Sequence, residues 1–158
     1  MNKFNYCIVL LLLSTLSLAQ NRKEAKKNKL KTLTTSITEN GKTIYESKLV
    51  FDANGNQIEK TDYNKEGQLK SINKIKYNDN GDEIEDSQYD ATNKLVEKKI
   101  IKYNALENKT EEQFFDALGK LVKKHMYTYD AKGLKTERKT LDAEGKVISI
   151  KKYAYTIR

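Results

Sequence analysis

His125 is the only histidine in the 158-residue chain, and imidazole is the side chain best suited to general acid–base chemistry near neutral pH. It lies in a predicted strand beside Lys123, Lys124 and Met126, and the chain has no serine at a strand-to-helix elbow that it could activate. A lone histidine within a strand is more often packed or solvated than catalytic. We therefore predict no catalytic residue and a protein that is not an enzyme.

Four carboxylates recur at intervals of 26 residues: Glu59, Glu85, Glu111 and Glu137. Because they fall on every second predicted strand, neighbouring members are expected about 9–10 Å apart. That separation is near the range of inverting glycosidases. The fourfold repetition, with no cleft implied, favours a structural position instead.

The segment Asn78-Asp79-Asn80-Gly81-Asp82 is weakly similar to a calcium-binding loop. It lacks the full set of acidic positions and the terminal glutamate of such loops, so a turn is the favoured interpretation. One histidine and one cysteine cannot build a histidine-rich or four-cysteine metal site. We expect no metal and no cofactor.

Large side chains recur four residues before each turn, and most of them are aromatic. Rows of exposed rings suit stacking on sugars, whereas rings that cover a turn and the next strand are structural. The regular repetition favours the structural role, so departures from the repeat are the better place to look for function. The recurring residues are Phe51, Tyr63, Tyr77, Tyr89, Tyr103, Phe115, Tyr129, Leu141 and Tyr155. The predicted candidate binding surface consists of Tyr77, Tyr103, His125, Tyr127, Tyr129 and Tyr153.

Glycines mark a regular series of turns, with gaps that alternate between 14 and 12 residues. An Asp or Asn stands three residues before nearly every one of them, which is the pattern of a type I turn. Two glycines are missing from the series, and Asn93 and Glu107 stand in their places. Asn tolerates left-handed backbone geometry, so Asn93 is a natural substitute. At Glu107 we expect the neighbouring Asn108 to take over.

The short intervals between turns leave room for strands but not for helices. The predicted fold class is all-β: an antiparallel meander of about ten strands, built from 26-residue two-strand repeats, in a single twisted or curled sheet. Apolar and charged residues mix on both faces, which does not suit a sandwich. The predicted strands cover 30–38, 43–51, 56–63, 68–77, 82–89, 94–103, 108–115, 120–129, 134–141 and 146–156.

Strand register is expected to follow from pairing the first and last residues of each four-residue turn. This register places apolar or β-branched residues opposite each other on one face, and a bulge after a glycine would shift it by one. On the other face, Lys74 is expected opposite Glu85 and Ile100 opposite Glu111. The expected pairs on the first face are Leu49–Ile58, Ile75–Ile84, Ile101–Thr110 and Tyr127–Thr136.

The segment Tyr129-Asp130-Ala131-Lys132-Gly133 resembles the YD repeats of RHS-type and teneurin-type proteins, and related segments extend from about Gly41 to the C-terminus. The resemblance implies a spiralling antiparallel sheet and carbohydrate binding. YD repeats usually have Arg after the glycine, where this chain has Lys, Asn, Asp or Leu. The chain also resembles, less closely, the MORN-variant repeats of antitoxin-like proteins. It has too few repeats for a closed shell, so toxin delivery is not implied.

The N-terminus has a basic start at Lys3, an apolar run over residues 7–13, and small residues at Ser17 and Ala19. These are the parts of a secretory signal peptide, predicted over 1–19; an anchor that stays attached is the alternative. Cleavage after Ala19 would leave a mature chain that begins at Gln20 and contains no cysteine. We expect an exported protein that is periplasmic, cell-surface or secreted.

Residues 20–31 are predicted to form a basic flexible tail ahead of a β-repeat domain over 32–158. The tail accounts for most of the formal net charge of +8 and could contact an anionic envelope surface. Its basic residues, opposed only by Glu24, are Arg22, Lys23, Lys26, Lys27, Lys29 and Lys31.

These features together favour an exported, non-enzymatic β-repeat protein that acts as a binding or scaffold module. The expected partner is a glycan or the cell-envelope surface, and nucleic acid is a poor partner for an exported chain. The alternative is a module that recognises another protein, such as an inhibitor or an antitoxin-like repeat protein.

Overall fold

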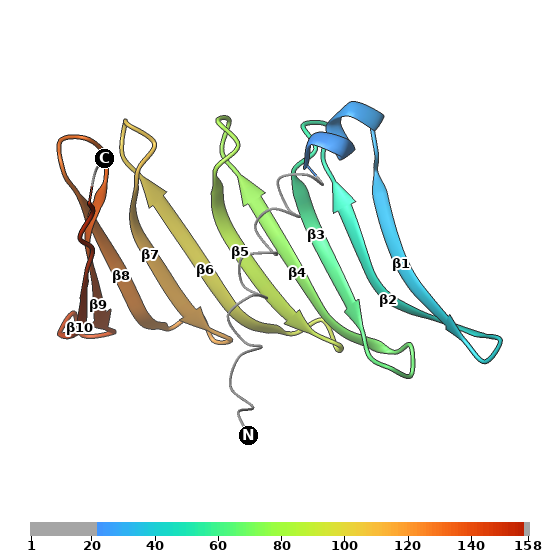
Figure 1. Ribbon diagram of the computed structural model, residues 1–158. Coiled ribbons are helices and arrows are strands. Elements are labelled where there is room, and N and C mark those ends of the chain that lie inside the picture. The colour runs from blue at the N-terminus through green and yellow to red at the C-terminus, as the bar shows by residue number, and fades with distance from the viewer. Residues whose placement is uncertain (1–21, 157–158) are drawn as a thin grey trace, which may run out of the picture. The chain divides into compact units, whose positions relative to one another are not determined.

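The computed structural model describes residues 22–156, and the predicted signal peptide over 1–19 lies outside them (Figure 1). The predicted fold class is confirmed, since ten antiparallel strands pair in chain order in one open meander. One compact unit extends to Leu69 and a second begins at Lys70, and we describe each by itself. The strands are β1 (Thr32–Glu39), β2 (Lys42–Phe51), β3 (Gln57–Tyr63), β4 (Leu69–Tyr77), β5 (Glu83–Asp90), β6 (Leu95–Tyr103), β7 (Lys109–Asp116), β8 (Leu121–Tyr129), β9 (Lys135–Asp142) and β10 (Val147–Lys152).

A short helix over residues 22–28 precedes β1 in the first unit, within the segment that we predicted to be a flexible tail. Lys29 ends the helix with a left-handed φ of 53°. The side chain of Ala25 is only 1% exposed. The helix lies so close to the turn before β3 that a Cβ on Gly55 would come within 2.5 Å of the Arg22 carbonyl oxygen.

The turns use Asp and Asn as the sequence predicted. The Asp116 carboxylate, for example, accepts hydrogen bonds from the backbone N–H groups of Leu118 and Lys120, both at 2.9 Å. Asn93 has a φ of 61° and replaces a turn glycine, also as predicted. The expectation at the other irregular turn was wrong: Glu107 itself takes the left-handed conformation, with a φ of 60°, and Asn108 does not.

The predicted register was wrong by two residues. Ile75 lies opposite Asp86, where the four-residue turn predicted Ile84. The reason is that the fifth residue closes each of these hairpins, as when the Asn78 N–H donates to the Asp82 carbonyl at 2.9 Å, and a bulge then adds one more residue. An even shift leaves every side chain on its predicted face. The corrected pairs are Leu49–Lys60, Ile101–Glu112, Tyr127–Arg138, Lys76–Glu85 and Lys102–Glu111.

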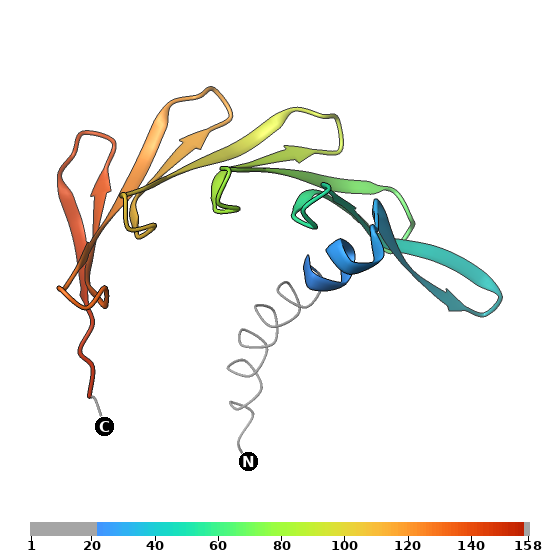
Figure 2. The same cartoon turned by 90° about the horizontal axis from the view of Figure 1, so that it is seen from above.

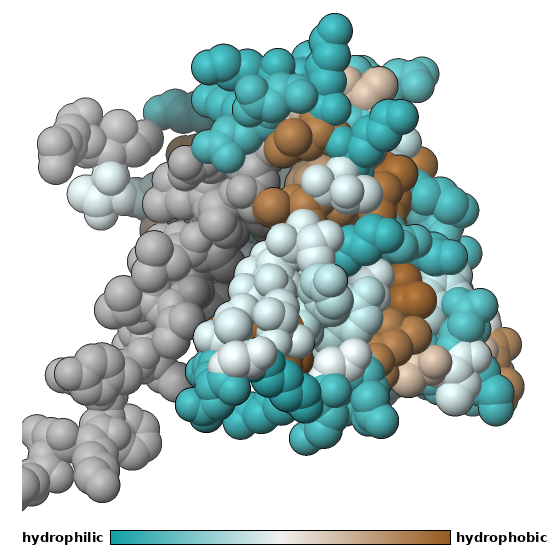
Figure 3. Space-filling view, turned by 90° about the vertical axis from the view of Figure 1, so that its right-hand side faces the viewer, coloured by the Kyte–Doolittle hydropathy of each residue, from teal (hydrophilic) through white to brown (hydrophobic). Residues whose placement is uncertain are grey.

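The sheet of the second unit has few buried side chains. Ile101 is 4% exposed and Leu141 is 9% exposed, and most other strand residues are only half-buried. Stability therefore depends on cross-strand pairs more than on a thick apolar core. Figure 3 shows the side of the molecule on which β1 and β2 of the first unit lie, and there small apolar groups lie among hydrophilic residues.

The two faces of the second unit carry different side chains. We call them the Glu112 face, which also carries Ile101, His125 and Arg138, and the Glu111 face, which is the opposite one. The turns form two rows at opposite ends of the strands (Figure 1). Figure 2 shows that successive hairpins of this unit are turned relative to one another, so its sheet curves.

Candidate functional site

The Glu112 face presents the same positions three times, at intervals of 26 residues. Each repeat contributes one residue at the start of a strand, one in the middle of that strand, and one on the next strand. The first repeat has Glu83, Asp86 and Lys99; the second has Lys109, Glu112 and His125; the third has Lys135, Arg138 and Lys151.

In the first repeat, Lys99 lies between two carboxylates. Its Nζ is 2.8 Å from Glu83 Oε1 and 3.4 Å from Asp86 Oδ2. Burial lowers the pKa of Lys99, but the ion pairs with Glu83 and Asp86 outweigh this effect and raise the pKa above its usual value. Lys99 is therefore paired with both carboxylates of this repeat.

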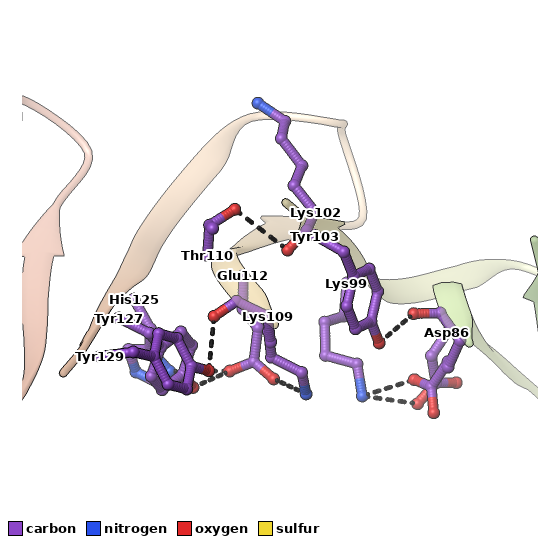
Figure 4. Close-up of polar contacts among 11 residues, drawn as sticks. Asp86, Lys99, Lys102, Tyr103, Lys109, Thr110, Glu112, His125, Tyr127 and Tyr129 are labelled. Carbon is purple, nitrogen blue, oxygen red and sulfur yellow. Dashed lines mark hydrogen bonds and ion pairs between the residues drawn. The ribbon is translucent and has the colours of Figure 1, made fainter. Parts of the chain in front are cut away.

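In the second repeat, Glu112 accepts hydrogen bonds from three side chains (Figure 4). Lys109 Nζ lies at 2.7 Å, His125 Nδ1 at 3.1 Å and the Tyr127 hydroxyl at 2.5 Å. Burial raises the pKa of Glu112, but the hydrogen bonds from these three groups outweigh it and lower the pKa to about 2. The four side chains therefore form one hydrogen-bonded network centred on the Glu112 carboxylate.

His125 is packed rather than free. Its side chain is 14% exposed, and its ring meets the edge of Phe114 with centroids 4.9 Å apart. A lone histidine within a strand is more often packed or solvated than catalytic, and His125 is packed.

In the third repeat, all three positions are cationic. Lys135 Nζ lies 4.5 Å from the ring centroid of Tyr127 and 5.8 Å from that of Tyr153, and Lys151 Nζ lies 5.3 Å from that of Tyr153. Within residues 22–156, no carboxylate is at ion-pair distance from the three cations. We call Tyr127, Lys135, Arg138, Lys151 and Tyr153 the basic aromatic patch.

Arg138 lies in the middle of this patch, opposite Tyr127 on one side and Lys151 on the other. Its Nε is buried and donates to no acceptor in the described part of the chain. A buried donor without an acceptor is unfavourable, and native proteins rarely leave one.

Three tyrosines at the turns tie neighbouring strands together through their hydroxyl groups. Tyr103 donates to the Glu83 carbonyl at 2.9 Å, Tyr129 to that of Lys109 at 2.7 Å, and Tyr155 to that of Lys135 at 2.8 Å. Burial, with help from nearby carboxylates, raises the pKa of Tyr103 to about 12, so its hydroxyl remains a donor.

The tyrosine contacts divide the predicted binding surface. Tyr103 and Tyr129 are structural, and Tyr77 ends β4 at the equivalent position. His125 and Tyr127 meet at Glu112, while Tyr153 lies beneath two lysines. Of the predicted residues, Tyr127 and Tyr153 have lysine ammonium groups over their rings, whereas Tyr129 lies opposite Lys135 with its hydroxyl bound to the Lys109 carbonyl.

The recurring glutamates on the Glu111 face form ion pairs. Glu85 binds Lys76 at 3.1 Å and Lys98 at 3.3 Å. Lys102–Glu111 at 3.0 Å repeats the cross-strand pair Lys76–Glu85, whereas Lys139–Glu137 at 3.4 Å joins two residues of β9. These contacts agree with the structural interpretation of the glutamates. A small depression of about 190 Å³ on this face is lined by Leu95, Lys98, Ile100, Phe115 and Gly119 and contains no carboxylate.

The segment that weakly resembles a calcium loop is a turn of the common kind. Asn78 Oδ1 accepts the Asp82 N–H at 2.8 Å, and the Gly81 N–H donates to the Asn78 carbonyl at 3.0 Å. Among residues 22–156, no three His, Cys, Asp or Glu side chains converge as metal ligands. The helix in this described range is too short to cross a membrane.

The charged half of the site was not predicted from the sequence; it consists of Glu112, Lys135, Arg138 and Lys151. The signal was present, because alignment of the chain at 26-residue intervals places Arg138 where Asp86 and Glu112 stand in the preceding repeats.

Fold and site together describe an all-β repeat protein with an irregular third repeat. No protein-family model matches the chain, and no curated protein matches it. A protein of unknown function from Bacteroides fragilis is 18% identical over 82% of this chain and 95% of its own, with a TM-score of 0.44. A variant of S. aureus TarM is 17% identical, with a TM-score of 0.30. The match covers 93% of this chain but only 32% of the TarM chain. A DUF3836 family protein from Parabacteroides distasonis is 18% identical over 72% of this chain and 91% of its own, with a TM-score of 0.25. At these TM-scores the likenesses carry no functional argument.

Proposed function

We propose that this protein is an exported, non-enzymatic binding module of the YD-repeat kind, and that it holds a glycan of the cell envelope on its Glu112 face. The observation that carries the proposal is the basic aromatic patch, where the repeat changes character. Positions occupied by Ile75 and Ile101 in earlier repeats become Tyr127 and Tyr153.

Aromatic residues at these two positions are not needed for the fold. Ile101 fills the equivalent place in the preceding repeat and is buried to 4% exposure. In contrast, lysine ammonium groups lie over the rings of Tyr127 and Tyr153. An aromatic ring offers a flat apolar surface with a polar tip, which suits the apolar face and hydroxyl rim of a sugar.

A binding role without catalysis agrees with the state of the titratable groups. Glu112 and His125 hydrogen-bond each other, and Glu85 and Glu111 are in ion pairs. A hydrolase needs a carboxylate or a nucleophile that is free to meet the substrate. The arrangement therefore supports a module that recognises a glycan without cleaving it.

A glycan array tests the proposal directly. The exported protein should bind a restricted set of glycans, and Tyr153→Leu should reduce that binding at least tenfold. Tyr45→Leu is the matched control, because Tyr45 is 56% exposed and lies in the first unit. An array on which the protein binds nothing would reject the proposal.

The free edges of the sheet favour a second candidate, a module that recognises another protein. Every residue of β1 and of β10 is exposed, and each of these strands pairs on one side only. An extended segment of a partner could add to such an edge through backbone hydrogen bonds. If the protein binds no glycan on the array and a pull-down recovers one protein in stoichiometric amount, this candidate is favoured.

A further inference from the structure

The charge of the Glu112 face changes from one repeat to the next. The first repeat combines two carboxylates with one ammonium group, and the second combines Lys109, Glu112 and a histidine. The third repeat has three cations at the same positions. The cationic end is therefore a local feature of β9 and β10 and not a property of the fold.

This substitution is unfavourable for the protein alone. Arg138 and Lys151 lie directly opposite each other, and like charges in that position destabilise a sheet. The first two repeats show that the same backbone accommodates cations that are paired with carboxylates. Like charges that destabilise the sheet, at a point where the repeat changes, are best explained by a ligand whose negative charge offsets them.

The geometry of Arg138 indicates what that ligand offers. Its Nε is buried without an acceptor in the described part of the chain; Tyr127 lies directly opposite on β8, and Tyr153 directly follows β10. A guanidinium group presents Nε and Nη donors side by side, and a carboxylate accepts such a pair with two oxygens. Arg138 as a whole is only half-buried, so a carboxylate on its exposed side would offset the surrounding positive charge, and a small movement of the side chain would let it accept from Nε as well.

We propose that the basic aromatic patch binds an acidic polysaccharide whose sugar rings carry carboxylates. The carboxylate of one sugar unit pairs with Arg138, the ring of that unit or its neighbour lies against Tyr127 or Tyr153, and Lys135 and Lys151 flank the chain. Because both lysine Nζ atoms lie within 5.8 Å of a ring centroid, the site recognises a ligand that combines a ring with a negative charge. This inference rests on the proposed function and specifies its ligand.

The test compares polygalacturonate with neutral dextran and with polyphosphate, a polyanion that has no rings, by titration calorimetry at physiological salt. Polygalacturonate should bind, and dextran and polyphosphate should each bind at least tenfold more weakly. If dextran bound as strongly as polygalacturonate, the charge of the ligand would have no role in binding. Equally strong polyphosphate binding would remove the role of the rings, since only charge would then matter.

Neighbouring residues on opposite faces provide matched charge variants. Arg138→Gln and Lys151→Gln should each weaken polygalacturonate binding, the former at least tenfold. Lys139→Gln and Lys152→Gln remove the same charge from the Glu111 face and should change it less than twofold. Arg138→Lys keeps the charge but loses the paired donors, so its affinity for polygalacturonate should still fall several-fold. Equal losses on both faces, or an Arg138→Lys variant that binds like the original protein, would overturn the inference.

The outcomes also separate this inference from the proposed function. If the protein binds neutral glycans on the array and Arg138→Gln has no effect, the glycan-binding function stands and the acidic ligand is wrong. If no glycan of any kind binds, both are wrong. Thermal unfolding of each variant checks that lost binding is not lost folding, and Lys151→Gln on the exposed strand β10 is the variant least able to disturb the fold.

Discussion

Glu112 stays ionised because three donors surround it. Its pKa of about 2 lies below the usual value of 4.5, so the ionised form is favoured in the folded state. The resulting stability is present above about pH 4.5 and is lost as the pH falls toward 2. We expect it to be worth about 1–2 kcal/mol once solvent screening is taken into account.

Glu112→Gln should therefore lower the free energy of unfolding at pH 7 by that amount, and the difference from the original protein should shrink as the pH approaches 2. Urea unfolding at several pH values measures this. Glu111→Gln on the other face should cost less than about 1 kcal/mol, because its partner Lys102 is 58% exposed. A Glu112→Gln effect that is independent of pH would contradict the hydrogen-bonded carboxylate.

The turn residues give a second prediction. Gly133 has a φ of 77°, so Gly133→Val should cost about 1–2 kcal/mol through backbone strain. Glu107 has a φ of 60° without being glycine, so Glu107→Gly should be neutral or stabilising, apart from an exposed hydrogen bond with Asn80. Equal effects in the two variants, measured by thermal unfolding, would show that turn geometry does not decide stability here.

At the scale of the element, the helix over residues 22–28 depends on the turn that it covers. A Cβ on Gly55 would clash with the Arg22 carbonyl oxygen, whereas nothing lies within 4 Å of the same position on Gly41. Both glycines have left-handed φ values, 78° and 75°, so backbone strain is matched between them.

Gly55→Ala should therefore destabilise the first unit more than Gly41→Ala, and it should speed hydrogen exchange in the helix. The exchange rate of the Leu30 amide reports on this, because the Leu30 N–H donates to the Ala25 carbonyl at 2.9 Å. If helix exchange is unchanged in Gly55→Ala, the helix is not packed on that turn.

The hairpins show why sequence predicted the strands but not their pairing. Asp116 and Gly119 lie in one short segment, so local residue types mark the turn and thereby both strand ends. The fifth residue and the bulge arise from backbone hydrogen bonds that few side chains specify, so the register was missed. Tyr127 and Tyr153 were visible as aromatics, but their cationic neighbours emerge only when Arg138 is placed on the same face.

At the scale of the whole molecule, each strand pairs only with its neighbours in the chain. Stability in such a sheet is close to a sum of local contributions, as in other repeat proteins. A globular core would instead make every strand depend on all the others.

Deletion of residues 134–158 removes β9 and β10 and should leave a protein that still unfolds cooperatively, at a lower temperature. Circular dichroism during heating measures the transition. Loss of any cooperative transition would contradict the local distribution of stability, because the remaining eight strands keep all their mutual pairings.

The central claim is that the third repeat is the binding surface, and NMR mapping of backbone amides tests it most directly. Titration of the protein with polygalacturonate should perturb amides around Tyr127, Arg138, Lys151 and Tyr153. Amides around Asp86 and Lys99, the equivalent positions of the first repeat, should stay unperturbed. Perturbations spread evenly over all repeats, or confined to β1, would contradict the claim.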